Sequence, residues 1–220
     1  ENPPSPVDAY ASDVRAEIGL APGDKMILQP TRIIPRKGIG HAINLVQMLG
    51  NPRYKLVVSH EAGDEGVEYK EMLAGFAKRS GVDIRFIATR LAETRGINAE
   101  GKKTFTLWDV YPHADFVTYP SMYEGFGNAF LEAVYFRKPI LVNRYDVFTR
   151  DIEPRGFRVP IIEGYLTPGV VEEVRRLIED PGHRRTMVEH NFRIAGRYYS
   201  YAVLRRGLMT MIANVRGLTT

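Results

Sequence analysis

Residues 119–142 read YPSMYEGFGNAFLEAVYFRKPILV. Within this stretch, a turn that contains Gly125 and Gly127 connects the end of an apolar strand-like run to an apolar helix-like run. The helical pattern begins at Asn128, so the turn stands directly before a helix N-terminus. Glycines permit close approach of the backbone, and the free N–H groups at the positive end of a helix dipole favour a phosphate group. The stretch therefore predicts a strand, a ligand-binding turn and a helix in succession.

Two glutamates, Glu124 and Glu132, lie on either side of this helix start. At a rise of 1.5 Å per residue, their spacing places the carboxylates on the order of 10 Å apart. Carboxylates that faced a diphosphate would repel it, so we interpret them as acceptors for hydroxyl groups at the two ends of a ligand whose charged middle rests on the helix. A sugar joined through diphosphate to a ribose has this order. Without the surrounding motif, such a pair would more simply be a turn residue and a solvated helix residue.

Short apolar strands alternate with amphipathic helices on both sides of this stretch. This pattern predicts an α/β fold, a Rossmann-like doubly wound parallel sheet of six strands with helices on both faces. We expect strands at 25–30, 54–60, 82–88, 115–120, 138–143 and 156–162, and helices at 8–18, 38–50, 65–80, 107–114, 128–136 and 168–180. Residues 181–216 have a helical pattern that breaks near Gly196 and contains no strand signal.

The pattern indicates one nucleotide-binding domain over residues 25–180. Residues 1–24, which open with three prolines before residue 10, are expected to form a linker and a short helix. Residues 181–220 are expected to form terminal helices that pack on the same domain. Because the chain opens on Glu1 and a Pro-rich segment, we interpret it as the second half of a longer protein.

Composition narrows the classes of function. The 220 residues are 44% hydrophobic, enough for a sizeable core, and the net charge of +4 does not by itself indicate a nucleic-acid partner. The absence of cysteine excludes disulfides and thiolate zinc sites. Neither a transmembrane run nor a signal-peptide pattern occurs in the sequence, so the expected location is the cytoplasm.

Ligands of doubly wound sheets bind beyond the carboxyl ends of the strands, which directs attention to residues 31–38, 60–64, 89–106 and 121–128. The first of these loops carries Arg32 and Lys37, which can stabilise a leaving diphosphate, before Gly38. Arg36 is expected to face solvent. Neither GxxxxGK[ST] nor GxGxxG follows the first strand, so the commonest triphosphate and dinucleotide signatures are missing.

Two segments carry a family resemblance: residues 27–46, ILQPTRIIPRKGIGHAINLV, and residues 107–142, LWDVYPHADFVTYPSMYEGFGNAFLEAVYFRKPILV. They resemble the carboxyl-terminal half of glycosyltransferase family 4, the retaining nucleotide-sugar glycosyltransferases of GT-B fold. The resemblance extends from Lys25 to about Asp180. Its most specific feature is R-x4-KG combined with E-x7-E, since either element alone is a weak signal.

This resemblance implies roles for individual residues. Arg32 and Lys37 bind the donor diphosphate, Glu124 contacts the donor sugar, and Glu132 holds the ribose hydroxyls. The remaining donor contacts are Gly38, Gly125, Phe126, Gly127, Asn128 and Ala129. The base is expected near residues 87–90, and no metal or other cofactor is implied. The polar segment 89–106 is longer than is usual in the family, so its role stays open.

The implied activity is transfer of a hexose from a UDP- or GDP-sugar to a hydroxyl acceptor. The acceptor is expected on a missing amino-terminal domain, through which the protein contacts a membrane surface if it does so at all. The isolated half is expected to be inactive. Two alternatives stay open: a non-catalytic sugar-nucleotide-binding module and half of a sugar-nucleotide epimerase.

Other candidates are weaker on sequence grounds. His41 is a possible phosphate contact, and His60 with its acidic neighbours lacks the second histidine of a metal site. Trp108, Tyr111 and Tyr119 are expected to be core or core-edge aromatics.

Overall fold

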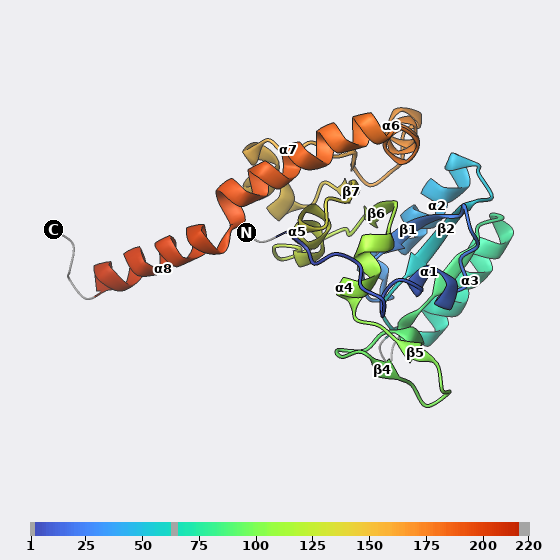
Figure 1. The fold of residues 1–220 in the computed structure, drawn as a ribbon. Helices are drawn as coiled ribbons and strands as arrows, with labels where there is room; N and C mark the ends of the chain where they lie inside the picture. Colours follow the sequence, from blue (N-terminus) through green and yellow to red (C-terminus); the bar gives the residue numbers. More distant parts are fainter. Residues whose placement is uncertain (1–2, 63–65, 216–220) are drawn as a thin grey trace.

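A computed structural model describes residues 3–62 and 66–215. Its centre is a six-stranded sheet in the order β3-β2-β1-β6-β7-β8, and all of its pairings are parallel (Figure 1). The strands are β1 (Lys25–Gln29), β2 (Tyr54–Val58), β3 (Ile84–Phe86), β6 (Phe116–Tyr119), β7 (Ile140–Asn143) and β8 (Ile161–Ile162). The predicted parallel sheet is therefore confirmed.

Helices cover both faces of this sheet (Figure 1). In β1, Met26 and Leu28 belong to one core cluster and Ile27 to the other, because successive side chains of a strand point to opposite faces. The helices are α1 (Val14–Glu17), α2 (Ile39–Leu49), α3 (Val67–Arg79), α4 (Leu107–Val110), α5 (Asn128–Tyr135), α6 (Pro168–Glu179), α7 (Pro181–Tyr199) and α8 (Tyr201–Val215). The first cluster contains side chains of α1, α4 and α5, and the second contains those of α2, α3 and α6.

The strand order reverses at β1. This strand pairs with β2 on one side, in the register Ile27 to Leu56, and with β6 on the other, in the register Ile27 to Phe116. The loops that follow β1 and β6 therefore diverge from adjacent strands, and a crevice opens between them.

Three elements differ from the sequence expectation. Helix α1 is a single turn, because residues 9–13 form turns rather than continuous helix. The strand expected over residues 156–162 is reduced to β8, since Pro160 interrupts the run and cannot donate a ladder hydrogen bond. The polar segment 89–106 contains an antiparallel hairpin of β4 (Gly96–Ile97) and β5 (Lys103–Thr104).

The break in the terminal helices is also displaced. Helix α7 continues through Gly196, and the chain turns at Ser200, whose backbone is extended. Helix α8 projects away from the domain (Figure 1) and has no buried side chain. Contrary to the expectation, α8 therefore does not pack on the domain. Six large apolar side chains of α8 recur at helical spacing and are exposed: Tyr201, Leu204, Leu208, Met211, Ile212 and Val215.

Some expectations fall on residues 1–2, 63–65 and 216–220 and lie outside the described residues: the first linker residues, the start of the helix at Glu65, the end of the 60–64 loop, and the last residues of the chain. Over the part of the chain that the structure describes, no helix is long and apolar enough to cross a membrane.

Candidate functional site

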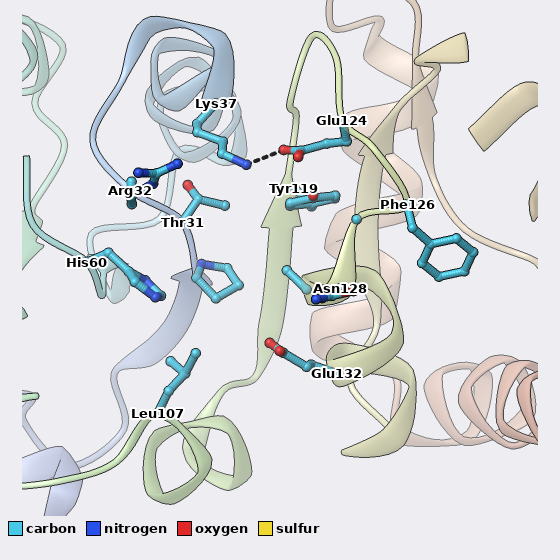
Figure 2. A pocket seen from close by; sticks show the side chains of 13 residues that line it. Thr31, Arg32, Lys37, His60, Leu107, Tyr119, Glu124, Phe126, Asn128 and Glu132 are labelled. Atoms are coloured by element: carbon cyan, nitrogen blue, oxygen red, sulfur yellow. Dashed lines mark hydrogen bonds and ion pairs between the residues drawn. The ribbon is translucent and has the colours of Figure 1, made fainter. Parts of the chain in front are cut away.

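A cavity of about 410 Å³ lies where β1 and β6 end (Figure 2). This volume falls in the usual range for small-molecule sites. One wall comes from the segments that follow β1 and β2, and the other from the segment that follows β6 and the start of α5. The lining residues are Pro30, Thr31, Arg32, Lys37, His60, Leu107, Tyr119, Glu124, Phe126, Gly127, Asn128, Ala129 and Glu132.

Gly38 joins the first wall to the end of β6. Its φ is +66°, and a Cβ at this position would lie 2.2 Å from the carbonyl oxygen of Pro120. Nearby, the Met122 N–H donates to the Arg36 carbonyl at 2.8 Å. A side chain at residue 38 would push these two loops apart, so the glycine is required for the close approach of the two walls.

Gly127 has the corresponding role at the start of α5. Its φ is +88°, and a Cβ would lie 2.6 Å from the Tyr145 hydroxyl and 3.1 Å from the Tyr119 hydroxyl. The turn can therefore rest directly on two tyrosines, and Asn128 and Ala129 in the first turn of α5 line the cavity. Gly125 is different, because a Cβ there would meet no atom within 4 Å.

Lys37 reaches across the cavity and forms an ion pair with Glu124 (Figure 2). Both side chains are largely buried, with relative exposures of 11% and 9%. Burial acts to raise the pKa of Glu124, but side-chain hydrogen bonds, first of all from Lys37, together with the Lys37 charge outweigh it, so the pKa lies below its ordinary value. Glu124 is therefore a carboxylate at neutral pH.

Arg36 also belongs to this group, contrary to the expectation that it faces solvent. Its Nη1 lies 3.4 Å from Glu124 Oε2, and its guanidinium stacks over the Tyr123 ring at 5.3 Å. The β1 loop thus brings two cations to one carboxylate. Pro35, beside Arg36, suggested a solvent-facing turn. The carboxylate partner, Glu124, lies on a loop remote in sequence, so the sequence pattern could not reveal the pairing.

Arg32 lines the same wall but is exposed, and within residues 3–62 and 66–215 its side chain has neither a hydrogen bond nor an ion pair. Its neighbour is His60 (Figure 2), whose Nδ1 lies 2.7 Å from Ser59 Oγ. Burial, and then the charges of Arg32 and Lys37, lower the pKa of His60. The imidazole is therefore neutral at pH 7. The guanidinium of Arg32, which no described residue occupies, has donors for an anion.

Glu132 lies at the opposite end of the cavity from Glu124 (Figure 2). The buried Tyr111 hydroxyl donates to Glu132 Oε2 at 2.9 Å. Burial and the nearby Glu132 charge raise the pKa of Tyr111, so its hydroxyl keeps its proton. This bond fixes the carboxylate and occupies only one of its oxygens, while the other can accept from a ligand.

Most of the candidate residues from the sequence therefore meet in one cavity. Gly38 and Gly125 do not line it, and Gly38 instead shapes the wall. His41 lies outside it, whereas His60 lines it as an uncharged side chain. Sequence reasoning missed Pro30, Leu107 and Tyr119 as lining residues; it placed Thr31 and His60 in ligand-facing loops but weighed His60 only as a metal ligand. His60 follows β2 at the ligand-facing edge, and this position is the signal that could have identified it.

A second hollow of about 630 Å³ adjoins the cavity and shares His60 and Leu107 with it. It lies beyond the ends of β2 and β3, where Ala88 and Leu91 line it. Trp108 also lines it and is 53% exposed, while its ring packs against the buried Phe136, so of the two expected positions, core or core edge, it has the second. Among the described residues, no group of three or more His, Asp or Glu side chains is placed to hold a metal ion.

The family described as glycosyl transferases group 1 matches residues 12–193. The chain belongs to this family. The mannosylglucosylglycerate synthase of Thermotoga maritima is 32% identical over 215 residues, and the match covers 85% of this chain and 48% of that protein. The chain thus spans about half the length of the curated relatives it matches.

Solved structures have the same fold as this glycosyltransferase chain. The carboxyl-terminal domain of the group 1 family protein LpcC from Francisella tularensis has a TM-score of 0.67 at 22% identity, with 90% of this chain and 95% of that chain covered. HepE of Anabaena in complex with UDP-glucose has a TM-score of 0.69 at 19% identity, with 96% of this chain and 53% of that chain covered. The fold is that of the carboxyl-terminal domain of a GT-B glycosyltransferase.

Proposed function

We propose that this chain is the donor-binding half of a retaining hexosyltransferase of glycosyltransferase family 4, which transfers a hexose from a nucleotide diphosphate sugar to a hydroxyl acceptor. The observation that carries the proposal is the placement of Glu124 and Glu132 at opposite ends of one cavity. The start of α5 lies between them, and Arg32 and Lys37 lie on the facing wall (Figure 2).

The diphosphate lies in the middle of the cavity. Exposed N–H groups at the start of α5 and the free guanidinium of Arg32 supply donors from both walls. Lys37 turns from Glu124 toward the phosphate when the donor binds. These groups supply the positive charge that the leaving diphosphate requires, so the proposed site needs no metal.

The two carboxylates hold the two neutral ends of the donor. Glu124, released from part of its pairing with Lys37, accepts hydrogen bonds from sugar hydroxyls. Glu132 accepts from the ribose through the oxygen that Tyr111 leaves free. A hydroxyl that donates to a carboxylate forms a strong, short hydrogen bond, which supports both assignments.

The base lies in the adjoining hollow beyond β2 and β3. Ala88 in the lining agrees with a base near residues 87–90. The exposed face of Trp108 offers a flat apolar wall against which a base can lie. Both uracil and guanine remain candidates, as UDP-sugar and GDP-sugar donors.

In the proposed transfer, the bond between the anomeric carbon and the diphosphate oxygen breaks, and its electron pair stays on the nucleoside diphosphate. The acceptor oxygen forms a new bond to the anomeric carbon on the same face, and the acceptor proton passes to the departing diphosphate oxygen. Arg32 and Lys37 stabilise the negative charge that develops on this oxygen.

The acceptor requires a second domain, which we propose lies outside this chain. Two observations support this view: the match to the Thermotoga relative covers 48% of that protein, and α8 leaves its apolar stripe uncovered. We therefore expect this chain to bind donor nucleotide but to catalyse little transfer. We further propose a cytoplasmic location, with membrane contact, if any, through that second domain.

Calorimetric titration of the chain with UDP, GDP and ADP tests the donor site, with Lys37→Ala and Glu132→Ala as variants. The expected result is binding of one nucleotide that both substitutions weaken by about tenfold or more, because each removes a charged hydrogen-bonding group. Glu68→Ala is the matched control, since Glu68 is an exposed carboxylate on α3, away from the cavity. Binding that both cavity variants leave unchanged would refute the site.

A further inference from the structure

A different cavity lies at the opposite edge of the sheet, beside the amino ends of β6 and β7. Its volume is about 340 Å³. Four cationic side chains line it, and a single carboxylate, that of Asp115, accompanies them. The cations are Arg15, Arg137, Lys138 and Arg184, which α1, the segment after α5, and α7 bring together.

Hydrogen bonds hold these cations in place mainly through neutral carbonyl groups. Lys138 Nζ donates to the Pro112 carbonyl at 2.7 Å, and Arg184 Nη1 donates to the carbonyls of Leu177 and Ile178 at 2.9 to 3.0 Å. A carbonyl satisfies a donor but carries no net charge. The positive charges of Lys138 and Arg184 are thus fixed in position without being neutralised.

Asp115 cannot balance them. It already lies 3.2 Å from Arg15 Nη1 and 3.1 Å from Lys25 Nζ, so two cations share it. Glu189 pairs with Arg137, at 2.8 Å. Burial, opposed by Asp115 and reinforced by the charges of Arg184 and Arg15, lowers the pKa of Lys138 to about 8. The cavity therefore has an excess of positive charge.

The backbone beside the cavity has an unusual conformation. Among the described residues, Arg137 is the one non-glycine residue with positive φ, at +51°. It follows the end of α5, where the Lys138 N–H donates to the Ala133 carbonyl at 2.8 Å, a helix ending that normally has glycine at this position. Keeping an arginine there costs about 1 kcal/mol or more, and such local strain concentrates at functional sites.

We propose that this cavity, which we call the rear cavity, binds a dianionic phosphate group, either inorganic phosphate or the monoester of a small soluble molecule. Lys138 has two further N–H donors beyond its bond to Pro112, and the guanidinium of Arg137 adds planar donors beside it. A bound dianion would neutralise the excess charge. The size of the cavity admits a phosphorylated small molecule but leaves little room for a whole nucleotide sugar.

Calorimetric titration of the chain with inorganic phosphate and with glycerol 3-phosphate tests this site, at constant ionic strength in a chloride buffer. The expected result is saturable binding with a Kd at or below about 1 mM. Lys138→Met should weaken it by about tenfold, because a charge-assisted hydrogen bond is lost. Competition between the two probes then shows whether the monoester or the free ion binds better.

Three further variants locate the anion. Lys102→Met, which removes an exposed lysine of the β4–β5 hairpin, should leave phosphate binding unchanged. Lys37→Met tests whether the anion binds instead in the cavity beyond β1 and β6. Arg137→Gly should weaken binding while relieving the backbone strain, so it keeps the test valid if Lys138→Met fails to fold. Phosphate binding that is lost in Lys37→Met but kept in Lys138→Met and Arg137→Gly would overturn the proposal, as would the absence of saturable binding at about tenfold higher concentration.

Discussion

The two cavities at opposite edges of the sheet are both lined by basic side chains, but they differ in how many carboxylates balance those charges. In the cavity beyond β1 and β6, here called the front cavity, Arg32 and Lys37 are matched by Glu124 and Glu132. In the rear cavity, four cations have one carboxylate among the lining residues. The same kind of residue is thus balanced at one edge and in excess at the other.

This difference teaches how each site would select a ligand. A ligand of the front cavity must bring both a negative centre and neutral hydroxyl ends, because Lys37 there already pairs with Glu124 and a second carboxylate, Glu132, lines the cavity. A simple anion gains little at such a site, since it competes with Glu124 for Lys37. In the rear cavity, Lys138 and Arg184 donate to carbonyl groups and, among the described residues, form no ion pair with a carboxylate, so a small dianion suffices.

The largest expected effect comes from Gly127→Ala, which would break the front cavity alone. The added Cβ meets the Tyr145 hydroxyl at 2.6 Å in a backbone with positive φ. We expect nucleoside diphosphate binding to fall by about a hundredfold and stability to fall by about 1–3 kcal/mol. Calorimetry and urea unfolding measure the two effects.

Gly125→Ala is the control for this substitution, because its Cβ would meet no atom within 4 Å. If both variants bind nucleotide as the wild type does, the close contact at Gly127 does not shape the site. Phosphate binding in the rear cavity should survive both changes.

Next in size is Glu124→Gln, which makes the charge balance of the front cavity resemble that of the rear. Without its carboxylate partner, Lys37 is free for phosphate, so we expect nucleoside diphosphate to bind about threefold to tenfold more tightly. The nucleotide sugar should lose its advantage over the nucleoside diphosphate, because its sugar hydroxyls lose an acceptor. Weaker binding of the nucleoside diphosphate would contradict the competition between Glu124 and phosphate.

A smaller effect is expected from Tyr111→Phe, which leaves Glu132 without the hydroxyl that orients it. Nucleotide binding should weaken by about threefold to tenfold, since one neutral donor is lost near a carboxylate. Tyr54→Phe is the matched control, because Tyr54 donates to Glu179 at 2.6 Å at the amino end of β2. Equal losses of binding in the two variants would show a general loss of stability rather than a role in the site.

The smallest effect is a pH dependence at the rear cavity. The pKa of Lys138 is lowered from 10.5 to about 8, so between these values the unfolded chain holds the proton that the folded chain has released. Stability therefore rises with pH in this window. Methionine does not titrate, so any stability advantage of Lys138→Met should be largest below about pH 8 and shrink toward pH 10.5, as measured by urea unfolding in phosphate-free buffer. If the difference in stability between Lys138→Met and the wild type did not change with pH, Lys138 would be solvated and its pKa would not be lowered.

Much of the fold could be predicted from sequence, because its strands are buried runs and its helices have apolar faces at regular spacing. The glycine turn before Asn128 located the front cavity, since it combines a strand end with a helix start. Eight of the ten predicted site residues line that cavity. Such a site can be predicted because the residues that form the turn and the helix start are consecutive in the sequence.

The remaining features depend on contacts between distant segments. Arg36 pairs with Glu124 because Gly38 lets its loop approach the end of β6, and spacing within the loop does not reveal this. Gly196 predicted a helix break, but α7 tolerates a glycine and turns only at Ser200. The rear cavity left no motif at all, since its cations come from three separate parts of the chain.

The position of β1 in the centre of the sheet has a kinetic consequence. Ile27 pairs with Phe116, so the two walls of the front cavity meet only after a long segment of intervening chain has been brought to closure. Closing a long loop costs entropy before its contacts form, and parallel pairings distant in sequence are slow to form. In refolding experiments, we expect nucleotide binding to recover later than helical signal, so the ligand would report the last stage of folding.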